Sequence, residues 1–68
     1  MANLDKDPQI EYVCYELVGR KGISYVHNVA NVMYDGSHGV CILQDVNEQP
    51  VVMIPLSRLL ELRIKYKD

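Results

Sequence analysis

Residues 40–44 form a short, mostly apolar run that is closed on both sides by turn-forming sequence. Residues 34–39 precede it and residues 44–50 follow it, and both stretches are rich in residues that let a chain reverse direction. Each turn therefore leads to a neighbouring strand. The pattern predicts a three-stranded antiparallel meander with residues 40–44 in the middle, between strands at residues 29–34 and 51–54.

The chain has 68 residues, a length that corresponds to one domain. Residues 1–8 are polar and end in Pro8, so we expect a flexible leader there and a single small β domain over residues 9–68. The net charge of −2 excludes a general basic field of the kind that attracts nucleic acid or anionic membrane. There is no signal-peptide pattern, and no apolar run approaches the roughly 20 residues of a membrane span, so we expect a cytoplasmic protein.

The region before the meander predicts a hairpin. Residues 9–18 read as the first strand, a Gly-Arg-Lys-Gly turn at residues 19–22 reverses the chain, and residues 23–27 return it. Asn28 and Asn31 favour a bulge or bend, which leaves open whether residues 23–34 are one bent strand or two. Alternation along the first strand places Ile10, Tyr12, Cys14, Glu16 and Val18 on one face and Glu11, Val13, Tyr15 and Leu17 on the other.

The last stretch changes character at Pro55, which cannot donate to a ladder. Ser57 is placed to cap a single 3₁₀ or α turn, after which residues 62–67 alternate between apolar and basic side chains and predict a final strand. The order of elements is similar to a five-stranded antiparallel SH3-like barrel with a short helical turn before the last strand, a likeness of fold that implies no function. The alternative is an α+β fold, a four-stranded antiparallel sheet with a C-terminal helix over residues 55–66.

No group of side chains has the spacing that catalysis or metal binding requires. His38 lies three residues before Cys41, which on a strand puts the two side chains on opposite faces. Neither Cys14 nor Cys41 belongs to a C-x₂-C knuckle of the type that structural zinc sites use. We therefore expect no catalytic residue, no metal, no cofactor and no enzymatic activity, with His27 and His38 in structural roles and both cysteines as free thiols.

Two groups of basic residues are the candidate ligand-binding site. Arg20 and Lys21 stand at a glycine-flanked tip, and a second row points from one face of the last strand: Arg63, Lys65 and Lys67. If the first and last strands pair, the two groups lie on one side and provide donors for a phosphate. The structural interpretation is that these cations keep a hairpin soluble and prevent strand edges from aggregating.

Tyrosines are the candidate contact residues for a protein partner. Four are spread over the predicted strands: Tyr12, Tyr15, Tyr25 and Tyr34. A phenol ring offers a wide contact area at low entropy cost and is enriched at interfaces, although core packing accounts for some of the four.

Hydrophobic residues make up 49% of the chain, and several predicted strands are apolar on both faces. A chain this short has no second layer to cover an outer face, so we expect a homo-oligomer. The function expected from these features is a non-enzymatic protein-interaction module of adaptor or inhibitor type. The alternative is a binder of a phosphate-bearing ligand, either a nucleotide or short single-stranded nucleic acid.

Overall fold

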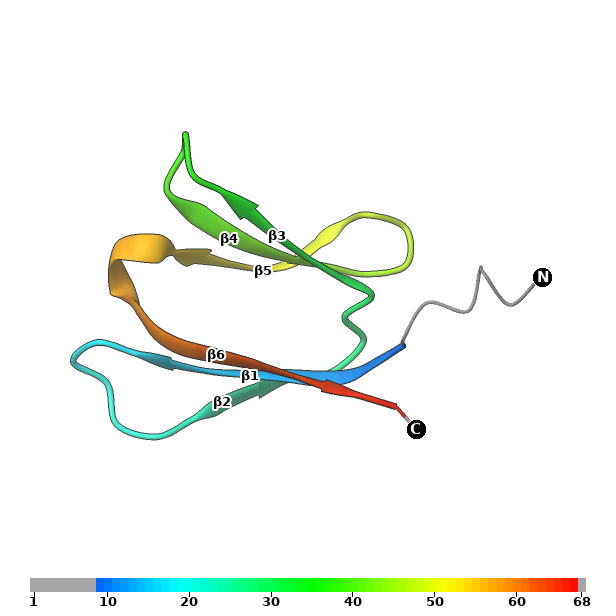
Figure 1. Cartoon of the computed structure of the whole chain (residues 1–68), viewed down its shortest axis with the longest axis horizontal. Coiled ribbons are helices and arrows are strands. Elements are labelled where there is room, and N and C mark those ends of the chain that lie inside the picture. Colours follow the sequence, from blue (N-terminus) through cyan, green and yellow to red (C-terminus); the bar gives the residue numbers. More distant parts are fainter. Residues whose placement is uncertain (1–8, 68) are drawn as a thin grey trace.

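The computed structural model describes residues 9–67, which form two three-stranded antiparallel sheets (Figure 1). The first sheet has the order β2-β1-β6 and the second the order β3-β4-β5. The strands are β1 (Ile10–Leu17), β2 (Ser24–Val26), β3 (Asn31–Asp35), β4 (Val40–Gln44), β5 (Pro50–Pro55) and β6 (Leu59–Tyr66). A 3₁₀ turn, η2 (Leu56–Arg58), joins β5 to β6. The leader predicted for residues 1–8 lies outside the described residues.

The predicted meander is confirmed as the second sheet. Strand β4 is its centre and pairs with β3 on one side and β5 on the other. Carboxylates close both connecting turns as Asx side chains typically do. Asp35 Oδ1 accepts the His38 N–H at 3.2 Å, and Asp45 Oδ1 accepts the N–H groups of Asn47 at 2.8 Å and Gln49 at 3.0 Å. With six strands and a single 3₁₀ turn among the described residues, the protein is mainly β.

The first and last strands pair with each other, and β1 pairs with β2 through the predicted hairpin. Gly19 and Gly22 have φ values of 78° and 95°, and residues other than glycine adopt this backbone conformation only with steric strain. A shift of register between Ile10 and Tyr12 marks a bulge in β1. Ile10 therefore packs against the core, and the prediction that Ile10 shares the face of Tyr12 is wrong because alternation does not continue through a bulge.

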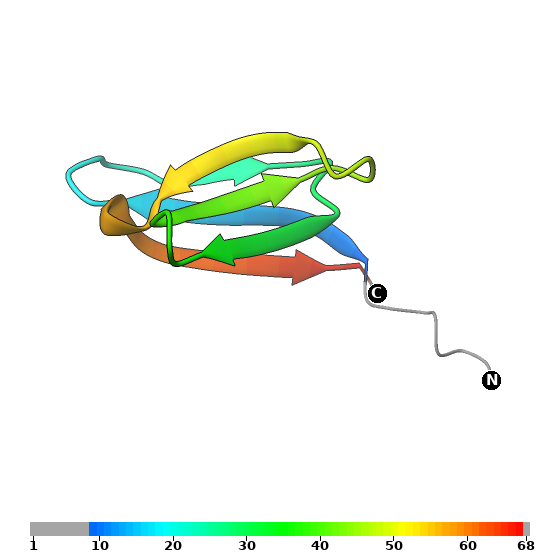
Figure 2. The ribbon, with the colours of Figure 1, turned by 90° about the horizontal axis from the view of Figure 1, so that it is seen from above.

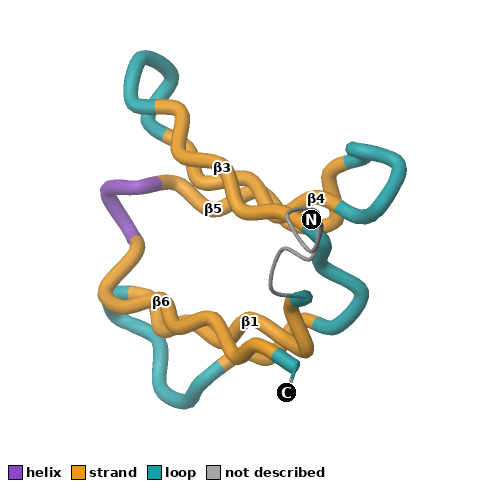
Figure 3. Tube along the Cα trace, turned by 45° about the vertical axis from the view of Figure 1, so that its right-hand side comes forward, coloured by secondary structure: helices purple, strands orange, loops and turns teal. Residues whose placement is uncertain are grey.

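The five-stranded SH3-like barrel is not confirmed. The described residues form six strands in two sheets, and no strand pair within residues 9–67 joins the sheets into a closed barrel. The physical reason lies at Asn28, whose φ of 64° breaks the extended chain between β2 and β3. Residues 23–34 are therefore two strands in different sheets rather than one strand bent around a corner, as Figure 3 shows.

The alternative of a helix over residues 55–66 is wrong. Only η2 is helical there, and β6 then runs for eight residues beside β1. Leu62 and Ile64 pack against the core while Arg63 points away, which is the period of a strand. The predicted cap at Ser57 is also wrong, because η2 is preceded by Pro55 and has no side-chain cap hydrogen bond.

The core lies between the two sheets and is small. Its buried members are Val13, Val29, Cys41, Leu43 and Ile54. Val13 comes from the first sheet, Val29 from the link between the sheets, and the other three from the second sheet. Among the described residues there is no helix with the length and apolar character needed to cross a bilayer.

We expect the substitution Ile54→Val to lower the free energy of unfolding by about 0.5–1.5 kcal/mol, because it removes one methylene from a filled site. The matched control is Val46→Ala, at a side chain that is 81% exposed, for which a change within about 0.5 kcal/mol is expected. Urea denaturation followed by circular dichroism at one protein concentration measures both. An equal loss in the two variants would contradict this placement of the core.

Candidate functional site

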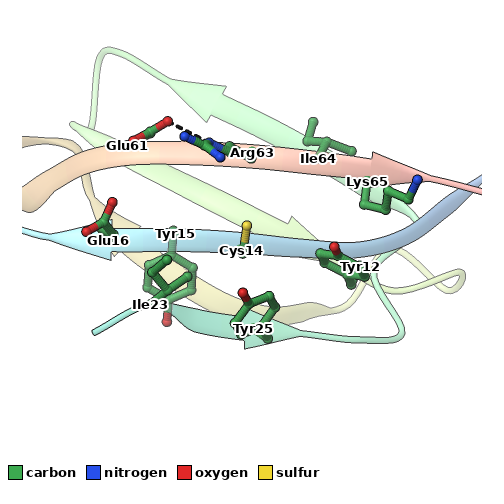
Figure 4. A pocket seen from close by; sticks show the side chains of 10 residues that line it. All are labelled: Tyr12, Cys14, Tyr15, Glu16, Ile23, Tyr25, Glu61, Arg63, Ile64 and Lys65. Carbon is green, nitrogen blue, oxygen red and sulfur yellow. Dashed lines mark hydrogen bonds and ion pairs between the residues drawn. The ribbon is translucent and has the colours of Figure 1, made fainter. Parts of the chain in front are cut away.

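An open pocket of about 300 Å³ lies on the first sheet, largely over its outer face (Figure 4). The strand register places Tyr25, Cys14 and Arg63 side by side across β2, β1 and β6, and Lys65 opposite Tyr12. The residues that line the pocket are Tyr12, Cys14, Tyr15, Glu16, Ile23, Tyr25, Glu61, Arg63, Ile64 and Lys65. Neighbouring strands therefore bring aromatic and charged side chains onto one surface.

An aromatic pair forms one wall of the pocket. The rings of Tyr12 and Tyr25 meet edge to face, with centroids 5.6 Å apart and planes at 62°. His27 extends the group, with its ring centroid 5.9 Å from that of Tyr12. Such a pair contributes about 0.5–1.5 kcal/mol beyond simple burial, so the rings are held in place before anything binds. Tyr25 is still 58% exposed.

The charges of the pocket are separated along the strands. Glu16 lies directly opposite Glu61, an arrangement that destabilises a sheet unless a cation offsets it. Arg63 supplies that cation, because its Nε donates to Glu61 Oε2 at 2.7 Å, and this hydrogen bond raises the pKa of Arg63 further above its ordinary value. Lys65, farther along β6, has no ion pair with any described residue. The pocket is thus acidic towards η2 and basic at the other end (Figure 4).

The structure places the predicted basic tip away from the basic row. Arg20 and Lys21 belong to the loop between β1 and β2, at the η2 end of the sheet. Val18 donates its N–H to the carbonyl of Arg58 at 2.8 Å, so the backbone of Arg58 lies beside the start of this loop. Sequence reasoning missed Arg58, because its position beside the loop follows only from the register of β1 with β6.

Arg63 and Lys65 are brought together on the outer face of β6, and Lys67 follows the end of that strand. Lys65 lies opposite Tyr12, whereas the basic loop begins only after Leu17, five residues along β1. At about 3.3 Å per residue Lys65 is roughly 17 Å from the loop, too far for one small anion to contact both, whereas Arg63, opposite Cys14, is roughly 10 Å from it along the strand. The structure therefore separates Lys65 and Lys67 from Arg20 and Lys21, with Arg63 between them.

The four predicted interface tyrosines also divide. Tyr12 and Tyr25 lie on the outer face of the first sheet, where the pocket is. Tyr15 packs against the core from the inner face and reaches the pocket beside Ile23. Tyr34 is opposite the buried Cys41 in the second sheet, yet it is 60% exposed because β3 is an edge strand.

A second exposed surface lies on the outer face of the second sheet. It was not predicted as a site from the sequence. Met33, Ile42 and Met53 form one row across β3, β4 and β5, and Val40 follows on the same side of β4. We name these four residues the methionine face. Met33 is 41% and Met53 58% exposed. None of the four residues is charged, and Asp35 lies beside them, opposite Val40 on the same side of the sheet. The signal for this face in the sequence was the presence of apolar residues on both sides of β4 and β5.

The turn between β3 and β4 gathers an aspartate, a serine and a histidine without forming a catalytic triad. Asp35 Oδ2 lies 2.8 Å from His38 Nδ1, and Ser37 Oγ lies 3.5 Å from that same nitrogen. In a triad the serine and the aspartate meet opposite ring nitrogens, so His38 cannot relay a proton between them here. Ser37 instead donates to Asp35 Oδ1 at 2.8 Å, which closes the turn.

The thiols do not build a reactive centre with the histidines. Cys41 is fully buried, and burial raises the pKa of its thiol, whereas Cys14 is half-buried on the other sheet. Both are free cysteines. Within residues 9–67 no three His, Cys, Asp or Glu side chains gather as a metal site would require. Comparison with protein-family models, curated proteins and solved structures finds no match for the chain.

We expect Ser37→Ala to raise the pKa of Asp35. Hydrogen bonds from Ser37 and then from His38 hold this pKa below its ordinary value. Because the pKa of Asp35 is lower in the folded chain, the ionised carboxylate stabilises the turn at any pH above the ordinary carboxyl pKa. This stabilisation is lost as the pH falls through the folded-state pKa. Titration of the Asp35 carboxyl carbon by NMR measures the shift, and Ser57→Ala, at an exposed serine in η2, is the control. An unchanged titration in Ser37→Ala would contradict the assignment.

Proposed function

We propose that this chain is a non-enzymatic protein-interaction module of adaptor or inhibitor type that acts as a homo-oligomer. The observation that supports it best is the methionine face, an apolar row on a sheet with nothing packed over it among the described residues. Exposed contiguous apolar surface on a soluble protein is typical of an interaction site. Methionine side chains are flexible and polarizable, so they adapt to the shape of a partner.

The arrangement of polar residues supports the same function. Asn31 and Gln44 are paired across β3 and β4, two residues from the Met33–Ile42 pair and on the same face. The Asn31 side-chain amide donates to Gln44 Oε1 at 3.1 Å, so polar groups border the apolar row. An apolar centre with a polar rim is the usual organisation of a protein interface. Tyr12 and Tyr25 provide a second contact area on the opposite side of the molecule, with rigid rings that lose little entropy on binding.

The partner contact is tested with Met53→Glu, which places a charge in the centre of the apolar row. The control is Val46→Glu, an exposed apolar residue in the loop after β4. Proteins from a host extract are crosslinked to each variant and identified by mass spectrometry. We expect specific partners of the wild type to be kept by Val46→Glu and lost by Met53→Glu. Retention of the same partners by both variants would contradict the methionine face as the docking surface.

A second candidate function is binding of a phosphate-bearing ligand, a nucleotide or short single-stranded nucleic acid. It is favoured by one observation, the position of Lys65 next to the Tyr12–Tyr25 pair in the pocket. Aromatic rings stack on bases and cations contact phosphates, so the two types of side chain together provide both contacts. The basic loop with Arg20 and Lys21 is then a separate region that does not belong to the site.

Fluorescence anisotropy with a labelled single-stranded oligonucleotide tests this candidate. We expect binding that weakens steeply as salt rises, because each contacted phosphate releases counterions. Lys65→Glu should weaken binding at least tenfold, while Lys21→Glu, the same charge change in the loop, should not. Absence of binding at low salt, or an equal loss in both variants, would contradict a nucleic-acid site in the pocket.

A further inference from the structure

We propose that the free edge of β6 is the contact through which two copies of this chain associate, by antiparallel pairing of the two β6 strands about a two-fold axis at Leu62. The inference rests on the proposed function, in which the chain acts as a homo-oligomer. It identifies the strand, the register and the charges that would form the contact.

Strand β6 is the longest open edge of the described molecule. It pairs with β1 on one side only, and its eight residues exceed the three of β2 and the five of β3. The edge strand β5 begins and ends in proline, which removes backbone donors. An unpaired edge presents N–H and C=O groups that another strand can pair with. Strand β6 is therefore the edge best suited to a second copy.

The charges on β6 favour the register centred on Leu62, in which no like charges meet at the axis. Pairing about Leu62 puts Glu61 opposite Arg63 of the partner subunit, and the symmetry repeats this contact on the other side of the axis. Pairing about Arg63 would set Glu61 opposite Lys65 of the partner subunit but would place two arginines face to face at the axis, and pairing about Ile64 would place Arg63 against Lys65 of the partner subunit. Like charges directly opposite are destabilising, and a shift by one residue would turn the apolar side chains outward.

The ion pair within each chain leaves room for the contact between chains. Arg63 reaches Glu61 through Nε alone, and the guanidinium has further N–H donors on its terminal nitrogens. Both side chains are largely solvent-accessible, with Arg63 74% and Glu61 46% exposed. Across the two-fold axis the four charges would alternate in sign around a square, so each carboxylate would meet two guanidinium groups.

Exposed apolar residues lie along the same side of the molecule. Leu60, at the bulge between β1 and β6, is 65% exposed and would lie beside Ile64 of the partner subunit. Figure 2 shows β3 and β6 along one side of the two layers, with β2 and β5 along the other. The same two-fold axis would therefore bring β3 towards its copy and cover Tyr34, which is 60% exposed.

Charge reversal on β6 tests the register. Glu61→Arg gives a chain with cations at both positions, and Arg63→Glu gives one with anions at both. Each variant alone would face its copy with like charges, so we expect self-association at least tenfold weaker than that of the wild type by sedimentation velocity. A mixture of the two restores opposite charges only between different chains, so we expect a heterodimer, identified by native mass spectrometry. Lys21→Glu, a charge reversal away from the edge, should self-associate like the wild type.

The outcomes separate this inference from the proposed function. A wild-type chain that is monomeric at millimolar concentration would overturn both the homo-oligomer and the β6 contact. Self-association that persists in both single variants, or a mixture that stays monomeric, would overturn the β6 contact alone. Circular dichroism confirms that the variants are folded. If either is not, isotope-filtered NMR on mixed-label wild type decides, because the proposed register requires contacts between the Leu62 methyl groups of the two chains.

Discussion

Packing between the inner faces of the two sheets is the interaction on which the rest of the structure depends. No strand pair joins the sheets in the described residues, so side chains such as Val13 and Leu43 hold the layers together. A domain of this size buries only about 60% of the surface of its unfolded chain. With the apolar inner faces used for the core, the apolar residues on the outer faces have nothing to cover them. Both the methionine face and the open edge of β6 follow from this shortage of covering layers.

The regular parts of the fold were readable from the sequence because turn residues punctuate them. Aspartate marks the reversals on both sides of β4, glycine marks the first of them, and alternation of apolar and basic residues marks β6. The errors fell where one residue changes the backbone locally. The bulge that turns Ile10 inward was missed, and the choice between one strand and two across Asn28 stayed open, because both depend on φ values and register that alternation does not encode.

The candidate site was predictable as a set of residue types and not as an arrangement. Arg63 and Lys65 lie on the outer face, as the alternation of residue types predicts. Only the strand register shows that Tyr12 lies opposite Lys65 and that Arg20 lies beyond the other end of β1. The methionine face needs the register of three strands at once, which no single segment reveals. Sequence reasoning therefore identified the excess of apolar residues and missed where that excess is exposed.

The two sides of the layered molecule differ in a way that limits growth. One side carries β3 and β6, while the other carries the three-residue β2 and the proline-bounded β5 (Figure 2). Once two copies have joined through the first side, the sheets of the pair would end in strands that are poor templates for further addition. Assembly would stop at a closed dimer, and the short strand and the prolines of the second side would protect the protein from growing into fibrils.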